Sequence, residues 1–182
     1  NLQLDIVCFS HLRWNFVYQR PQHLLSRLAK RFRLFYIEEP VFDADSSYLE
    51  SRQEQDQLLV IVPHLPTGWD DEAINKILDE LLDEYFASFN IKNFIAWYYT
   101  PMAYRAKRVY SADLVIYDCM DELSAFLYAP PDLKQKEKEL MERADIVFTG
   151  GYSLYEAKKN RHLNIHLFPS SIDRSHFHRA RM

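Results

Sequence analysis

Residues 4–37 have the sequence LDIVCFSHLRWNFVYQRPQHLLSRLAKRFRLFYI, which is the pattern of a strand, a helix and a second strand. We expect the strands over Leu4–Ser10 and Leu34–Ile37, because both runs are short and apolar. Pro21 suits the first turn of a helix, where its missing backbone N–H costs nothing, and apolar residues recur behind it at helical spacing. This segment therefore predicts a β-α-β unit, as found in parallel sheets.

The same alternation continues along the chain. Further strands are expected at Leu58–Val62, Phe94–Tyr99, Leu114–Tyr117, Ile146–Phe148 and Asn164–Phe168. Further helices are expected from a cap at Asp70 and Asp71 to Phe89, from about Asp132 to Arg143, and from Ser153 toward Asn160, where Ser153–Glu156 matches the S-x-x-E capping box. The polar segment Asp43–Gln57 lacks a period and is predicted to be a surface excursion.

The predicted strands are continuously apolar, as a parallel sheet covered on both faces requires. We therefore predict one α/β domain over residues 1–182, a doubly wound, mostly parallel Rossmann-like sheet of about seven strands with helices on both faces.

Composition excludes several classes of function. The 22 basic and 26 acidic side chains give a net charge of −4, so a nucleic-acid partner is not expected. No run approaches the roughly 20 apolar residues of a membrane span, and the first residues show no secretory signal, so we expect a cytoplasmic protein. Cys8 and Cys119 lie inside strand-like runs, which favours buried free thiols over a disulfide.

The common nucleotide-binding loops are also excluded. With three glycines the chain has neither G-x-G-x-x-G nor a Walker loop. Its C-terminal histidines, at 162, 166, 176 and 178, lack the spacing of metal ligands, so we expect no metal site there.

Ligands of open α/β sheets bind beyond the carboxyl ends of the strands. After the first strand, Arg13 and Arg20 flank aromatic residues such as Trp14, an arrangement that suits a phosphate with stacking on a sugar or lipid. The alternative is local packing, with Arg20 paired to an acid.

Two other strand ends carry candidate groups. Asp118, Asp121 and Glu122 crowd one strand end, where they would serve as a base, a hydroxyl acceptor or a divalent-ion site, or as ordinary caps and surface charges. Gly150 and Gly151 precede a helix and suit either a modest anion site or a plain turn.

The order of three segments resembles the N-terminal half of a GT-B glycosyltransferase of the family-4 type. These segments are Val115–Leu123, Ala144–Gly151, and Phe168–Asp173 with Phe177. The opening segments Phe9–Trp14 and Gln19–His23 resemble a bacterial subgroup associated with cell-surface polysaccharide synthesis, including teichuronic-acid-type transferases. The resemblance covers nearly the whole chain.

The resemblance implies a two-lobed enzyme that retains anomeric configuration and needs no obligatory metal or other cofactor. This chain would be the acceptor-side lobe, inactive alone, and the C-terminal lobe that binds the sugar nucleotide would be absent from it. The sequence departs from the family where the first loop lacks Gly-Gly, where Met120 replaces a histidine, and where Ser171 replaces a glycine.

The remaining candidates divide by role. The catalytic candidates are His11, Asp118 and Asp121. The candidates for substrate binding are Arg13, Trp14, Gln19, Arg20, Tyr98, Thr100, Gly150, Gly151 and Ser153. The expected partners are a sugar-nucleotide donor and a glycan or lipid-linked acceptor.

Two kinds of surface contact are also expected. The basic tail Arg161–Arg181 is expected to be either a solvated linker or a contact with the inner face of the membrane. A face that the second lobe would cover would allow self-association. Two alternatives to the transferase stay open: a non-catalytic module that binds a carbohydrate or lipid carrier, and one lobe of a sugar-nucleotide epimerase.

Overall fold

The computed structural model describes residues 4–104, 111–125, 127 and 129–170. The described strands are β1 (Asp5–Ser10), β2 (Leu34–Glu38), β3 (Tyr48–Gln55), β4 (Leu58–His64), β5 (Phe94–Tyr98), β6 (Leu114–Cys119), β7 (Ile146–Thr149) and β8 (Ile165–Leu167). The described helices are α1 (Arg20–Leu28), α2 (Asp71–Ser88), α4 (Leu133–Arg143) and α5 (Tyr152–Lys158), with short 3₁₀ turns η1 (Pro101–Ala103) and η2 (Leu123–Ala125).

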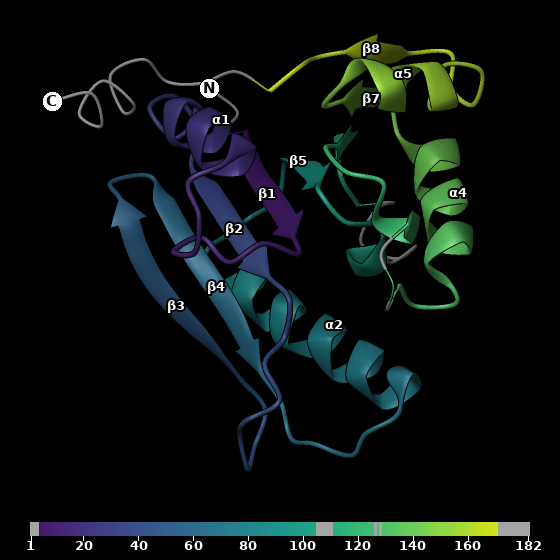
Figure 1. The fold of residues 1–182 in the computed structure, drawn as a ribbon. Helices are drawn as coiled ribbons and strands as arrows, with labels where there is room; N and C mark the ends of the chain where they lie inside the picture. The colour runs from purple at the N-terminus through teal and green to yellow at the C-terminus, as the bar shows by residue number, and fades with distance from the viewer. Residues whose placement is uncertain (1–3, 105–110, 126, 128, 171–182) are drawn as a thin grey trace, which may run out of the picture.

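All eight strands form one sheet in the order β3-β4-β2-β1-β5-β6-β7-β8 (Figure 1). Every neighbouring pair is parallel except β3 with β4. On one side of β1 the neighbouring strands are β2, β4 and then β3 at the edge of the sheet. After β4 the chain passes through α2 and returns to β5, which lies on the other side of β1. This reversal confirms the prediction of a doubly wound α/β domain.

The prediction that Asp43–Gln57 is only a surface excursion is wrong, because this segment contains β3. The strand lies at the edge of the sheet, antiparallel to β4, and most of its side chains are exposed or half-buried. An edge strand needs no continuous apolar run, and its charged side chains discourage pairing with other chains. His64 of β4 anchors the region, with Nδ1 2.6 Å from Asp43 and Nε2 3.2 Å from Glu50.

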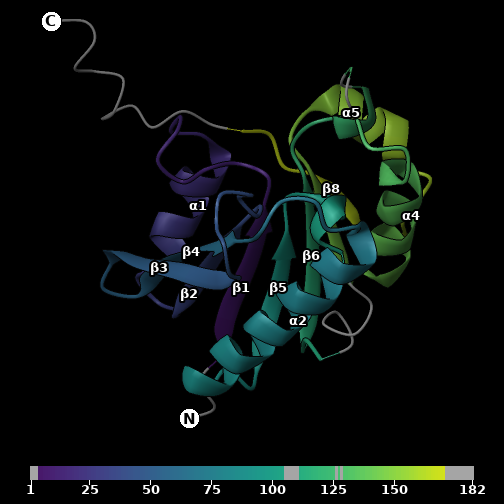
Figure 2. The ribbon, with the colours of Figure 1, turned by 90° about the horizontal axis from the view of Figure 1, so that it is seen from below.

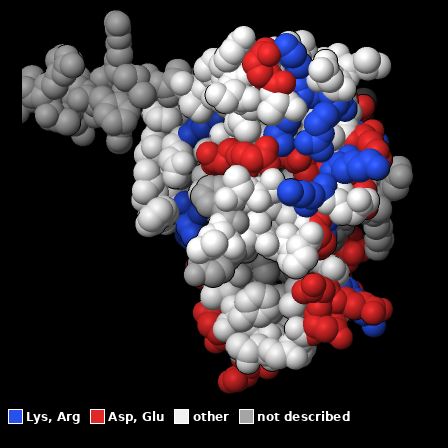
Figure 3. Space-filling model, turned by 45° about the vertical axis from the view of Figure 1, so that its right-hand side comes forward, with Lys and Arg blue, Asp and Glu red and all other residues white. Residues whose placement is uncertain are grey.

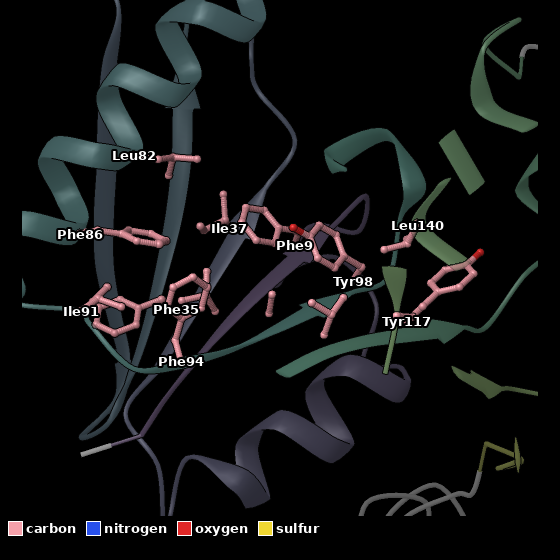
Figure 4. Close-up of a cluster of buried hydrophobic side chains, with 14 of the residues drawn as sticks. Phe9, Phe35, Ile37, Leu82, Phe86, Ile91, Phe94, Tyr98, Tyr117 and Leu140 are labelled. Carbon is pink, nitrogen blue, oxygen red and sulfur yellow. The ribbon is translucent and has the colours of Figure 1, made fainter. Parts of the chain in front are cut away.

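Helices cover both faces of the sheet, as predicted (Figure 2). On one face, Leu25 of α1 and Ala29 directly after the helix belong to the same buried cluster as Cys8 and Tyr36. On the opposite face, α2 and α4 cover a second cluster, whose labelled members in Figure 4 are Phe9, Phe35, Ile37, Leu82, Phe86, Ile91, Phe94, Tyr98, Tyr117 and Leu140. Successive strand residues therefore point to opposite faces, and both faces are apolar.

Two of the predicted helix starts agree with the structure. Pro21 lies in the first turn of α1, and the Asp70 carboxylate accepts the backbone N–H of Ala73 at 2.8 Å. The capping box at Ser153 does not form, since α5 begins at Tyr152 with Gly151 in the N-cap position. The Gly150 N–H donates to Cys119 O at 2.8 Å, which continues the pairing of β7 with β6 by one residue. Only Gly150 and Gly151 separate β7 from α5.

Several expectations from composition can be compared with the structure. Cys8 and Cys119 are both buried free thiols, as predicted. None of the described helices is long and apolar enough to cross a membrane. On the face shown in Figure 3, Lys and Arg side chains are interleaved with Asp and Glu, so this face presents no continuous basic stripe. His176, His178 and the tail beyond Ser170 lie outside the described residues.

Candidate functional site

The predicted site residues all come from one edge of the molecule. They lie at or directly after the carboxyl ends of β1, β5, β6 and β7, on both sides of the point where the strand order reverses. At such a point two neighbouring loops leave in opposite directions and form a crevice. The fold therefore brings together residues that are far apart in the sequence.

Arg20 and Asp118 form a buried ion pair at this edge. Arg20 Nε donates to both carboxylate oxygens of Asp118, each at 3.0 Å, and Nη2 lies 2.9 Å from Oδ1. Arg20 Nη1 donates to the backbone oxygen of Phe168 at 2.5 Å, and the guanidinium lies 4.9 Å from the centre of the Phe168 ring. The local-packing alternative is confirmed for Arg20. Neither group is exposed to hold a phosphate or a sugar hydroxyl as predicted.

Two aromatic residues, Trp97 in β5 and Tyr99 directly after it, complete the surroundings of Asp118. Burial raises the pKa of its carboxyl group, while Arg20 and the donor groups of Tyr99 and Trp97 oppose that rise. Tyr99 and Trp97 were not among the sequence candidates, because an aromatic residue inside an apolar strand is indistinguishable from core. Asp118 and Arg20 thus join α1, the end of β6 and the segment after β8.

His11 and Asp121 are the catalytic candidates that reach the surface. Asp121 is exposed, and His11 is half-buried. Burial lowers the pKa of His11 from its usual 6.5, although the charge of Asp121 and the backbone of Tyr99 oppose the fall. The imidazole is therefore neutral near pH 7 and can accept a proton from a bound hydroxyl group.

The loop after β1 presents Arg13 and Trp14. Arg13 Nη1 donates to Glu38 Oε2 at 3.0 Å and to the backbone oxygen of Glu39 at 2.6 Å, yet its side chain stays 40% exposed. The backbone N–H of Trp14 donates to Glu38 Oε1 at 2.8 Å. The indole ring packs edge-on against Tyr36, with 5.0 Å between ring centres. Arg13 is thus the predicted arginine that still faces solvent.

Gln22 holds this loop in shape. Its Nε2 donates to the backbone oxygens of Trp14 and Val17, at 2.8 and 3.1 Å, and its Oε1 accepts the Gln19 N–H at 3.0 Å. Gln19 is the N-cap of α1, so its backbone serves the helix start. Sequence reasoning placed Gln22 after the strand but assigned it no role, because its partners are backbone atoms of the loop.

Two residues predicted to contact substrate are buried instead. Tyr98 is fully buried and stacks on Phe9 with 4.9 Å between ring centres, so the prediction that its ring binds substrate is wrong. Thr100 is 1% exposed, and its Oγ1 accepts the Met102 N–H at 3.2 Å to cap η1. Both residues stabilise the fold beneath the site.

The loop after β7 is shaped by close packing. A Cβ on Gly150 would lie 3.0 Å from Met120 Cα, so a side chain there would crowd the backbone directly after β6. Gly151 has open space around it, and Ser153 is exposed near the start of the seven-residue α5. The structure thus accounts for Gly150 without a ligand.

The predicted cluster of three acids is divided between the two sides of β6. Asp118 pairs with Arg20, the partly exposed Glu122 lies 2.8 Å from Lys158 Nζ, and Asp121 is exposed. Within the described ranges, no group of three or more His, Cys, Asp or Glu side chains is arranged to hold a metal ion.

Comparisons with solved structures show proteins of similar fold. The chain matches an E. coli trehalose-6-phosphate enzyme bound with UDP-2-fluoro glucose at a TM-score of 0.59 and 9% identity, over 95% of this chain and 50% of that one. It matches sucrose-phosphate synthase from Thermosynechococcus elongatus at 0.60 and 15% identity, over 92% of this chain and 48% of that one. The fold is that of one GT-B lobe.

A further GT-B match is α,α-trehalose-phosphate synthase (UDP-forming) from Burkholderia xenovorans in complex with glucose-6-phosphate. Its TM-score is 0.54 at 9% identity, over 85% of this chain and 41% of that one. The chain thus spans about half the length of these structures. No protein-family model matches the sequence, and no curated protein matches it. The predicted GT-B lobe is confirmed as a fold.

Proposed function

We propose that this chain is the acceptor-side lobe of a retaining glycosyltransferase of the family-4 type, which moves a sugar from a sugar nucleotide to a cell-surface glycan or lipid-linked acceptor. The observation that carries the proposal is the polar carboxyl edge of a GT-B lobe, where His11, Arg13 and Asp121 each remain partly or fully exposed. The likeness to half of several sugar-transferring synthases supports it.

The proposed reaction exchanges one bond for another. The bond between the donor's anomeric carbon and its phosphate oxygen breaks, and an acceptor hydroxyl oxygen bonds to that carbon. The hydroxyl proton leaves with the donor phosphate, so the lobe need not supply a strong base, a metal or another cofactor. Neutral His11 would hold the hydroxyl, Arg13 would bind an acidic group of the acceptor, and Asp121 would accept a hydroxyl hydrogen bond.

The buried pair supports this edge from below. Arg20 belongs to the first turn of α1, Asp118 to the end of β6, and the oxygen of Phe168 to the segment after β8. The pair thereby fixes the spacing between the loop that carries His11 and the loop that carries Asp121. We assign Arg20 and Asp118 as positioning residues in this proposal.

The test is a transfer assay on a longer protein that contains this chain, with a panel of UDP-, GDP- and ADP-sugars. We expect sugar to appear on an acceptor, and we expect His11→Ala and Asp121→Ala to lower kcat at least tenfold. Glu142→Ala, on the exposed side of α4, is the control and should change nothing. The 182-residue chain alone should not turn over.

Other outcomes would overturn the proposal. An epimerised sugar nucleotide without acceptor would identify the epimerase, and sugar binding without turnover would identify the binding module. Unchanged transfer in both variants would remove His11 and Asp121 from the site. Location in the cytoplasm or at the inner membrane face, and self-association, stay predictions of the same proposal.

A further inference from the structure

A cavity of about 300 Å³ opens at the carboxyl ends of β1, β2 and β4. It lies on the face of the sheet that α2 covers, whereas Arg20 and Asp118 lie on the face that α1 covers. Its volume is at the lower end for small-molecule pockets, which suits a ligand group of one ring. None of the residues assigned above as catalytic or substrate-binding lines it.

The floor of the cavity is apolar and rigid. Phe9 and Ile37 come from the ends of β1 and β2, and Leu78 and Leu82 come from α2. All four side chains are at most 4% exposed, so they belong to the core. Phe42 also lines the cavity and is 45% exposed, so part of its ring is accessible to a ligand.

The rim of the cavity carries two acidic side chains and one amide, all of which can form hydrogen bonds. Glu39, Asp71 and Asn75 line it and are exposed. Carboxylates and an amide oxygen accept hydrogen bonds from hydroxyl groups, and the amide also donates. An aromatic wall, an apolar floor and several acceptors are together the surroundings that a sugar ring needs for its C–H face and its hydroxyl groups.

The same rim is unfavourable to a phosphate group. Lys136 is the basic residue among the described lining residues, and its Nζ lies 2.9 Å from Asp132, which compensates its charge. The Glu38 carboxylate is occupied elsewhere, by Arg13 at 3.0 Å and Arg52 at 3.5 Å. The remaining charged side chains among the described lining residues, Glu39 and Asp71, are acidic, and like charges brought close together reduce affinity.

We propose that this cavity binds one uncharged, unphosphorylated sugar ring of the acceptor. The identification of that ring as the acceptor rests on the proposed function, but its binding can be measured without turnover. The proposal separates this chain from the B. xenovorans synthase, whose structure holds glucose-6-phosphate.

Saturation-transfer NMR on the 182-residue chain tests the proposal. The probes are glucose, galactose, mannose and N-acetylglucosamine, each beside its own 6-phosphate. We expect at least one neutral sugar to bind at least tenfold more tightly than its 6-phosphate. The double variant Glu39→Gln with Asp71→Asn should reduce that preference severalfold, because it removes the repulsion of the phosphate while keeping hydrogen-bonding oxygens at the rim.

A matched pair of variants locates the binding. Asn75 and Lys76 are neighbours on α2 and both are exposed, but only Asn75 lines the cavity. Asn75→Trp should abolish binding of the neutral sugar, and Lys76→Trp should leave it unchanged. Circular dichroism of both variants checks that α2 is intact.

Three results would overturn the inference: no neutral sugar of the four binds, a 6-phosphate binds as tightly as its parent sugar, or Asn75→Trp binds like the unmodified chain. Failure here is distinct from failure of the proposed function. Transfer by the longer protein without neutral-sugar binding at the cavity removes only this inference. Binding at the cavity without transfer removes the glycosyltransferase and leaves a sugar-binding site.

Discussion

Two buried ion clusters lie on opposite sides of β6 and differ in how they are built. Asp118 points toward α1 and pairs with Arg20. Its neighbour Tyr117 points toward α4, where its hydroxyl donates to Glu137 Oε1 at 3.0 Å. Glu137 also accepts from Lys158 at 2.7 Å and from Arg161 at 2.9 Å.

The difference separates scaffold from site. The Glu137 cluster joins β6, α4 and α5, and Lys158 extends it to Glu122 beside η2. The Arg20 cluster joins only segments at the carboxyl edge, where the candidate site lies. A buried pair adds little net stability over apolar packing, but removing one partner is costly. Both clusters therefore constrain geometry, and only one constrains the site.

The largest effect is expected from Glu137→Leu. The substitution leaves Lys158, which is 2% exposed, with only the half-exposed Glu122, and it removes the acceptor of the Tyr117 hydroxyl. We expect the free energy of unfolding to fall by about 3–5 kcal/mol, measured by urea denaturation. Glu142→Leu, on the exposed side of the same helix, is the control and should stay within about 0.5 kcal/mol. A similar loss in both variants would contradict the distinction between buried cluster and surface.

A somewhat smaller effect is expected from Arg20→Met. It leaves the Asp118 carboxylate buried without its cation, although the polar groups of Tyr99 and Trp97, which help to lower its pKa, remain. We expect a loss of about 3 kcal/mol in the same urea experiment. Adding Asp118→Leu should restore most of that loss, because two apolar side chains then replace the pair. If the double variant is less stable than Arg20→Met, the pair contributes net stability and the comparison fails.

The sequence predicts the elements of this fold well, because most of the strands are apolar runs and the longer helices have clear periods or start signals. β3 escapes prediction because an edge strand pairs on one side only and can be polar. The Arg20–Asp118 pair spans 98 positions, so no local pattern shows it. Only the general expectation that strand ends meet at one edge placed both residues near the site.

The sequence also does not predict the orientation of the aromatic residues in β5 and directly after it. Tyr98 and Tyr99 are consecutive, so one points toward Phe9 and the other toward the face of Asp118. In a strand buried on both faces, an apolar sequence does not tell which residue takes which face. The prediction therefore chose Tyr98 as the residue near the ligand, although Tyr99 is the one on the Asp118 side.

The smallest effect, and the one that separates the two clusters most directly, is expected in the reactivity of the cysteines. Burial raises the pKa of Cys8 well above its usual range, with a further rise from the charge of Asp118. Burial also raises the pKa of Cys119 to about 11. The charge of Glu137 adds to this rise, and the charge of Lys158 opposes it. Because the thiolate is the reacting form, both should be nearly inert to iodoacetamide at pH 8.

Each thiol then reports on one cluster. Glu137→Leu should speed alkylation of Cys119 a few-fold more than that of Cys8, since Cys119 shares the α4 side of the sheet. Arg20→Met should speed alkylation of Cys8 more than that of Cys119, because Cys8 lies on the α1 side of the sheet. Mass spectrometry of the two cysteine peptides gives the ratio of rates. An equal ratio in both variants would mean that the clusters loosen one common unit, and that the site cannot be disturbed separately from the scaffold.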